Sequence, residues 1–105
     1  MSGALLHEDE FVVTSELGLH ARPAGLFVTL ADLFQAEMKV GPGDEWVDGR
    51  SVLSLLSLAA AAGTKLRIRA VGSDAVEAVA ALGRLLEEPR GAGDGQPRVK
   101  PAGRD

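Results

Sequence analysis

Residues 18–24, with the sequence GLHARPA, bring together residue types that suit phosphate chemistry. The neutral imidazole of His20 is a nucleophile, and the guanidinium of Arg22 matches phosphate oxygens in charge and geometry. Pro23 is typical of the first turn of a helix, where the amide groups have no partner inside the helix. Those amides and the positive end of the helix dipole favour an anion beside His20. The segment therefore predicts that His20 carries a phosphoryl group.

A simpler interpretation of His20 remains open, because a histidine near a helix start is often a cap or an ordinary surface residue. The chain has only two histidines, and His7 lies in an acidic N-terminal segment that we expect to be exposed to solvent. The absence of cysteine and of a second clustered histidine argues against a soft-metal site. We therefore expect no metal and no cofactor.

Length and composition restrict the class of protein. One hundred and five residues allow one domain with one modest core. Without cysteine there is no disulfide framework, and the N-terminus has no signal pattern. No apolar run approaches the ~20 residues of a membrane span. The net charge of -4 and the lack of a basic stripe argue against nucleic acid as a partner. We expect a cytoplasmic monomer with no direct membrane insertion.

The first half of the chain predicts a strand, a helix and a hairpin. We expect residues 1–9 to be frayed, residues 10–15 to form a half-buried strand, and residues 21–34 to form a helix. Residues 36–40 and 45–48 should form a hairpin around the turn at residues 41–44. The apolar residues at helical spacing in the first helix are expected in the core: Leu26, Phe27, Leu30, Leu33 and Phe34.

The second helix should begin after Ser51, whose hydroxyl can accept a hydrogen bond from an amide of the first turn. Leu55 and Leu58 share one face and are expected in the core. Residues 59–62 should continue or fray this helix until Gly63 ends it. The cluster expected to project outward as a docking surface consists of Val52, Leu53 and Leu56. A long loop or a partner subunit could instead cover that cluster.

The last part of the chain predicts a strand at residues 64–71 and a third helix that starts near Asp74. Asp74 and Glu77 have the spacing of a capping box. Residues 89–105 are rich in glycine, proline and charge, and we expect them to be disordered. The element order β-α-β-β-α-β-α favours an α+β open-faced sandwich over residues 1–88. It should have a four-stranded, largely antiparallel sheet with three helices on one face.

Two segments resemble a known family. Residues 17–24 resemble the active-site signature of HPr, the phosphocarrier of the bacterial phosphoenolpyruvate-dependent phosphotransferase system. Residues 50–58 resemble the regulatory-serine region of that family, and the overall resemblance covers about residues 8–88. It implies that His20 accepts phosphate at its Nδ1 (pros) nitrogen from Enzyme I and passes it to an EIIA component. The protein would then be a stoichiometric carrier and not a turnover enzyme.

The resemblance also assigns roles around these residues. Arg22 would neutralise the phosphate, and the helix start would hold it through the backbone of Ala21, Pro23 and Ala24. Ser51 would be the residue modified by a dedicated serine kinase, although a plain N-cap explains it as well. A phosphate there would add roughly -2 charge beside the docking surface.

Several positions depart from the sugar-type members of the family. Thr29 and Asp32 stand where those members often carry lysines, and Ala59 stands where glycine is common. Ser54 leaves the second helix uncharged. These residues resemble nitrogen-related paralogues at least as well, so a regulatory relay stays open beside sugar transport. Two further hypotheses are a partner-binding regulator controlled by Ser51, with His20 silent, and an interaction domain without phosphate chemistry.

Overall fold

The computed structural model describes residues 5–87 and confirms the predicted element order. The prediction of disorder for residues 89–105 falls outside the described residues. The strands and helices follow along the chain as β1 (Leu6–Val12), α1 (Ala21–Ala31), β2 (Glu37–Gly41), β3 (Val47–Asp48), α2 (Val52–Ser57), β4 (Lys65–Val71) and α3 (Ala75–Glu87).

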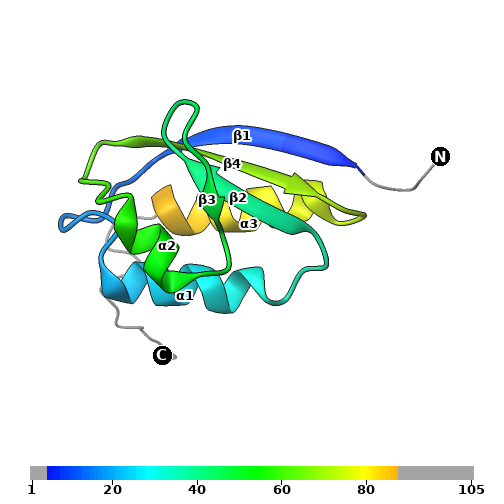
Figure 1. Ribbon diagram of the computed structural model, residues 1–105, viewed down its shortest axis with the longest axis horizontal. Coiled ribbons are helices and arrows are strands. Elements are labelled where there is room, and N and C mark those ends of the chain that lie inside the picture. The colour runs from blue at the N-terminus through cyan, green and yellow to red at the C-terminus, as the bar shows by residue number, and fades with distance from the viewer. Residues whose placement is uncertain (1–4, 88–105) are drawn as a thin grey trace, which may run out of the picture.

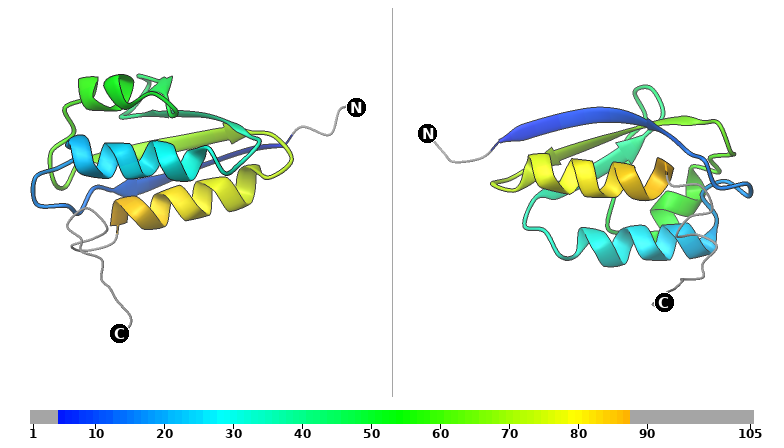
Figure 2. Two further views of the ribbon diagram at one scale, coloured as in Figure 1. Left: turned by 90° about the horizontal axis from the view of Figure 1, so that it is seen from below. Right: turned by 180° about the vertical axis from the view of Figure 1, so that it is seen from behind.

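The four strands form one antiparallel sheet in the order β1-β4-β2-β3 (Figure 1). Helices α1 and α3 lie side by side across one face of this sheet, and α2 lies near β3 on the same side (Figure 2). Among residues 5–87 no helix lies on the opposite face. This arrangement confirms the predicted open-faced sandwich.

The core lies between the sheet and the helices. In the central strand β4, Leu66, Ile68 and Ala70 are fully buried and alternate with charged residues on the open face. Phe27 of α1 and Leu55 of α2 are fully buried as well. The apolar face of β4 is therefore directed toward the helices, as its alternating pattern predicts.

Strand β1 begins and ends earlier than the sequence pattern indicates. Residues 6–9 are ordered strand residues, and His7 is partly buried opposite Ala70. The prediction of a frayed segment is therefore wrong for residues 6–9, and residues 1–4 lie outside the described residues. The expected exposure of His7 is wrong as well. The charged residues belong to an edge strand, where solvent and side chains satisfy the polar groups. At this edge the Asp9 carboxylate accepts a hydrogen bond of 2.8 Å from the amide of Glu10.

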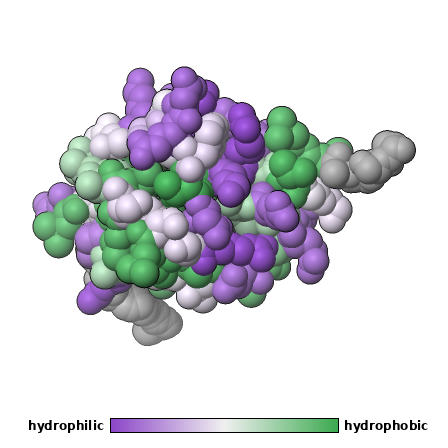
Figure 3. All heavy atoms as spheres, in the orientation of Figure 1, coloured by the Kyte–Doolittle hydropathy of each residue, from purple (hydrophilic) through white to green (hydrophobic). Residues whose placement is uncertain are grey.

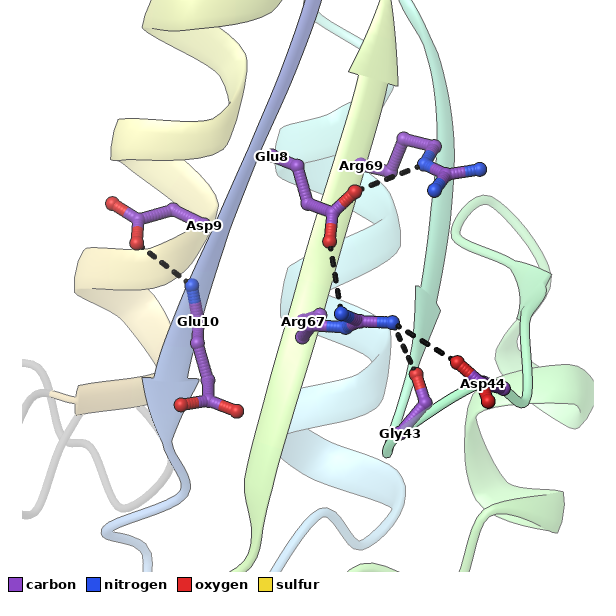
Figure 4. A network of polar contacts seen from close by, with 7 residues as sticks. All are labelled: Glu8, Asp9, Glu10, Gly43, Asp44, Arg67 and Arg69. Carbon is purple, nitrogen blue, oxygen red and sulfur yellow. Dashed lines mark hydrogen bonds and ion pairs between the residues drawn. The ribbon is translucent and has the colours of Figure 1, made fainter.

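A polar network covers the open face of the sheet (Figure 4). Glu8 pairs with Arg67 at 3.3 Å and with Arg69 at 3.1 Å. Arg67 also donates to the carbonyl of Gly43 in the β2–β3 turn at 2.6 Å. The guanidinium carbons of Arg69 and Arg67 lie 4.5 and 5.1 Å from the centre of the Trp46 ring, within cation–π range. The network connects both outer parts of the sheet to β4, and it gives Glu8 of β1 its partners.

Helix α1 is shorter than predicted and buries a narrower face. Its fully buried residues include Ala24, Phe27 and Ala31, whereas Leu26 is 38% exposed and Leu33, beyond the helix end, is 74% exposed. The prediction that Leu26 and Leu33 belong to the core is wrong. Small residues occupy much of the buried face, with Phe27 as its one large side chain. The larger leucines consequently lie at the margin.

The connection from α1 to β2 is held by Asp74, which comes just before α3. Its carboxylate accepts hydrogen bonds from the amides of Gln35 and Ala36 at 2.8 and 2.9 Å. The Asp74 carboxylate therefore binds amides that are distant in sequence and does not cap α3, so the predicted capping box with Glu77 is wrong. Spacing along the chain could not reveal this, since the two amides lie in another part of the sequence.

Arg50 also binds the connection from α1 to β2. Its Nη2 donates to the carbonyls of Phe34 and Ala36 at 2.6 and 2.9 Å, and its amide donates to Asp48. We predict that Arg50→Ala lowers the free energy of unfolding by about 2 kcal/mol, because two carbonyls lose a charged donor. Urea denaturation measures this change. An unchanged denaturation midpoint in Arg50→Ala would show that the two bonds are energetically irrelevant.

Helix α2 ends at Ser57, so the predicted continuation over residues 59–62 is wrong. Leu58 is the C-cap and is only partly buried. Ala59 follows with a φ of +50°, the left-handed conformation that directs the chain away from the helix. Alanine rarely adopts this conformation, which explains why an alanine-rich sequence suggested more helix.

Helix α3 packs closely on β1 through Gly83. A Cβ atom at this position would lie only 2.1 Å from the ring of Phe11, so the glycine provides space for the aromatic side chain. Val79 and Leu82 are buried as the periodicity indicates, but Val76 is 49% exposed near the start of the helix. The helical spacing of Val76, Val79 and Gly83 predicts one buried stripe, and for Val76 this prediction is wrong.

Candidate functional site

His20 is the N-cap residue of α1. Its backbone is extended, with φ -92° and ψ -169°, and its amide donates to the carbonyl of Gly18 at 2.9 Å. Its carbonyl accepts the first helical hydrogen bond, from the amide of Ala24 at 3.0 Å. The imidazole makes no capping hydrogen bond. The backbone therefore positions His20 at the helix start and leaves its side chain free for another role.

The first turn of α1 provides donors beside this imidazole. The amides of Ala21 and Arg22 come before the first hydrogen bond inside the helix, so they have no acceptor within it. Pro23 has no amide hydrogen. Pro23 and Ala24 are buried and hold the turn against the domain. The amides of Ala21 and Arg22 and the positive end of the helix dipole therefore lie next to His20. The expectation that Pro23 and Ala24 also hold the phosphate through their backbone is wrong, because Pro23 has no amide hydrogen and the Ala24 amide donates to the His20 carbonyl.

The two nitrogens of the imidazole differ in their surroundings. The side chain is partly buried, and Nε2 is buried without a hydrogen-bond partner among the described residues. In this orientation of the ring, Nε2 is therefore not accessible to an incoming phosphorus atom.

Arg22 lies in the same turn with an exposed side chain. Within residues 5–87 its guanidinium makes no ion pair, in contrast to Arg67 and Arg69 on the open face of the sheet. It can therefore turn toward an anion at His20 without breaking an existing interaction. Such a contact would be a charge-assisted hydrogen bond, which is stronger than a neutral one.

The loop that carries His20 rests on the segment after α2. Gly18 has a φ of +75°, and a Cβ there would lie 2.3 Å from the carbonyl oxygen of Ala60. That same carbonyl accepts a hydrogen bond of 2.8 Å from the amide of Leu19, whose side chain is buried. Sequence reasoning missed Ala60, because a backbone acceptor in a run of alanines has no recognisable signal.

Ser51 is confirmed as the N-cap of α2, since its hydroxyl oxygen accepts a hydrogen bond of 3.1 Å from the amide of Ser54. The residue is partly exposed. It lies at the start of α2, whereas the His20 loop contacts the chain after the end of this helix. The structure therefore places Ser51 and His20 at different ends of α2.

The predicted docking surface is only partly exposed. Leu53 is 79% exposed, but Val52 and Leu56 are partly buried against the core, so the three do not project outward together. Leu17, in the His20 loop, is 76% exposed and was missed. The only available signal was an apolar residue beside a loop glycine. Apolar surface gathers over α2 and the first turn of α1 (Figure 3).

His7 lies in a different part of the molecule, beside a groove between β1 and α3. No group of three metal-ligating side chains occurs among residues 5–87. In the same residues no helix combines the length and apolar character needed to cross a membrane.

The fold and the site define a small open-faced α+β domain with a histidine at the start of a helix. The chain belongs to the HPr family of the phosphotransferase system, because the family model described as "PTS HPr component phosphorylation site" matches residues 7–88. This membership gives it the phosphocarrier class.

Individual relatives agree with this assignment. The phosphocarrier protein HPr of Neisseria meningitidis serogroup B is 38% identical over 82 residues, which cover 78% of this chain and 92% of the relative. The crystal structure of HPr from Bacillus anthracis has a TM-score of 0.74 and 34% identity, covering 78% of this chain and 98% of that one. Crh, the catabolite repression HPr of Bacillus subtilis, has a TM-score of 0.62 and 33% identity with the same coverage.

Proposed function

We propose that His20 accepts a phosphoryl group from phospho-Enzyme I and passes it to an EIIA component. The observation that carries this proposal is the free imidazole at the N-cap of α1, with Nε2 buried and two amide donors beside it. Membership in the HPr family supports the phosphocarrier role.

The transfer is a displacement at phosphorus. The lone pair of His20 Nδ1 forms a bond to phosphorus while the bond between phosphorus and the histidine nitrogen of the donor breaks. The electron pair of that bond returns to the donor imidazole. Arg22 and the amides of Ala21 and Arg22 then stabilise the negative charge on the phosphoryl oxygens.

Delivery to EIIA is the same step in the opposite sense, with His20 as the leaving group. Each molecule is loaded once and unloaded once per transfer. The protein is therefore a carrier and a co-substrate, and the catalytic groups for phosphoenolpyruvate cleavage belong to Enzyme I.

Incubation with phosphoenolpyruvate and Enzyme I tests the proposal. We expect one phosphate per chain, labile in acid and stable in base, located on residue 20 by fragmentation mass spectrometry. Acid-stable label on a serine, or no label with folded protein and several Enzyme I sources, would overturn it.

A serine-controlled regulatory role is the second candidate. It is supported by the partly exposed Ser51 hydroxyl at the start of α2 and by the likeness to Crh, whose name refers to catabolite repression. A serine kinase would add roughly -2 charge near Leu53 and weaken docking there. If the protein acts only as a regulator through Ser51, His20→Ala would leave partner binding intact.

Ser51→Asp tests this role without losing the cap, because aspartate is a good N-cap residue. We expect unchanged stability and severalfold slower phosphorylation by Enzyme I. Ser51→Ala is the matched control: it should lose about 1 kcal/mol of stability and keep the wild-type transfer rate. Equal rates in both variants would contradict the regulatory role.

Leu53 should contribute to docking. We predict that Leu53→Glu raises the KM of phosphorylation by Enzyme I severalfold, because a charge replaces an exposed apolar contact, with little change in melting temperature. Leu33→Glu is the control, since Leu33 is similarly exposed beyond the other end of α1. An equal rise in KM for both variants would show a nonspecific charge effect. Unfolding of Leu53→Glu would place the residue in the core.

A further inference from the structure

Ala59 is the one residue other than glycine with positive φ among residues 5–87. Its φ of +50° lies in the left-handed region, where a side chain clashes with the backbone and glycine is preferred. The residue follows Leu58, the C-cap of α2, and its side chain is exposed. No burial of the methyl group accounts for this conformation, so the strain is held by the backbone contacts that follow.

Those contacts reach the loop that carries His20. The turn at Ala59 directs the carbonyl of Ala60 to the amide of Leu19, at 2.8 Å. The backbone of Ala60 also faces Gly18, where even a methyl group would lie within 2.3 Å of its oxygen. Leu19 immediately precedes His20. One short backbone path therefore connects the strained turn to the helix start that positions the imidazole.

The same loop is held a few residues further along. The amide of Gly63 donates to the carbonyl of Val13 at 2.7 Å, and the amide of Val13 donates to the carbonyl of Thr64 at 2.9 Å. These bonds fix the base of the His20 loop. Nearer to His20, the Ala60–Leu19 backbone hydrogen bond joins the loop to the segment after α2, and it acts together with the buried side chains of Leu19 and Ala60.

We propose that Ala59 is a positioning residue for His20, an inference that rests on the proposed phosphocarrier function. An alanine in the left-handed region has a far smaller range of backbone angles than a glycine. It therefore holds the Ala60 carbonyl in one direction and keeps His20 in the orientation that phosphoryl transfer needs. Stability is lost in return, as is common where backbone strain lies beside a functional site.

Two substitutions separate rigidity from strain. Ala59→Gly removes the strain and loosens the turn, whereas Ala59→Asn relieves part of the strain and keeps the turn restricted. We expect both variants to melt at a higher temperature than wild type. For phosphorylation by Enzyme I, Ala59→Gly should lower kcat about threefold to tenfold with unchanged KM, because small misplacements at a reacting atom have large effects. Ala59→Asn should keep the wild-type kcat.

Hydrogen exchange gives a readout that does not depend on phosphoryl transfer. The Leu19 amide should exchange faster in Ala59→Gly than in wild type or Ala59→Asn, despite the higher melting temperature. Ala62→Gly is the matched control, because Ala62 is exposed in the same loop without positive φ, and it should change neither kcat nor Leu19 exchange.

The outcomes distinguish this inference from the proposed function. If Ala59→Gly keeps the wild-type kcat and the wild-type exchange rate of the Leu19 amide, the positioning role is overturned. The carrier role is still upheld in that case if the wild-type protein is labelled. Equal loss of kcat in Gly and Asn variants would also overturn the positioning role, since rigidity would then be irrelevant. Absence of label on wild type would refute the carrier role. Faster Leu19 exchange in Ala59→Gly would still establish the mechanical link.

Discussion

His20→Ala should accept no phosphate from Enzyme I and should retain its fold. The substitution removes the proposed nucleophile, and no neighbouring side chain in the described first turn of α1 can replace it. The stability effect should stay within about 0.5 kcal/mol, because the imidazole makes no capping bond and its Nε2 is buried without a described partner. Labelling with radioactive phosphoenolpyruvate and a urea denaturation curve measure the two quantities.

His7→Ala is the control, because His7 is the second histidine of the chain and lies in β1. It should be labelled to the wild-type level. Full acid-labile label on His20→Ala would contradict the assignment of the acceptor. Loss of label on His7→Ala with an intact fold would place the chemistry at the groove between β1 and α3.

Arg22→Glu should slow phosphorylation by about a hundredfold and leave the fold intact. The guanidinium is exposed and makes no ion pair within residues 5–87, so its removal costs the folded state little. At the site, a charge-assisted bond to the phosphate is replaced by a repulsive carboxylate. A difference of about 3 kcal/mol in the transition state corresponds to that factor. Single-turnover transfer from phospho-Enzyme I measures the rate.

Arg22→Lys separates charge from geometry. Lysine keeps the positive charge but cannot form the two-pronged contact of a guanidinium. Its rate should fall between wild type and Arg22→Glu, at about a tenth of the wild-type value. A wild-type transfer rate in Arg22→Glu would remove the proposed role of this residue.

Much of the site could be predicted from local sequence, because its geometry depends on local physics. A proline soon after His20 places the helix start, and a helix start has free amides whatever surrounds it. Ser51 was predicted as a cap for the same reason. The alternation of β4 predicted its buried face, since that strand lies in the middle of the sheet and has one covered side.

The remaining features depend on partners that are distant in sequence. The acidic start of β1 has the composition of a frayed end, but Glu8 in this segment pairs with Arg67 and Arg69 of β4. Asp74 had the spacing of a local cap, yet its carboxylate serves the connection between α1 and β2. Ala60 acts through its backbone carbonyl, which residue identity does not encode. Local patterns could not distinguish these cases.

Trp46 gives the molecule an optical probe of its own. It is the single tryptophan of a chain without tyrosine, so fluorescence excited at the red edge of protein absorption arises from this side chain alone. The ring stacks on arginines of the open sheet face, whereas His20 lies at the start of a helix on the other side. We therefore expect its emission to report unfolding of the sheet and not to change when His20 is phosphorylated. Unfolding of phosphorylated and unphosphorylated protein can thus be compared by one signal without a label.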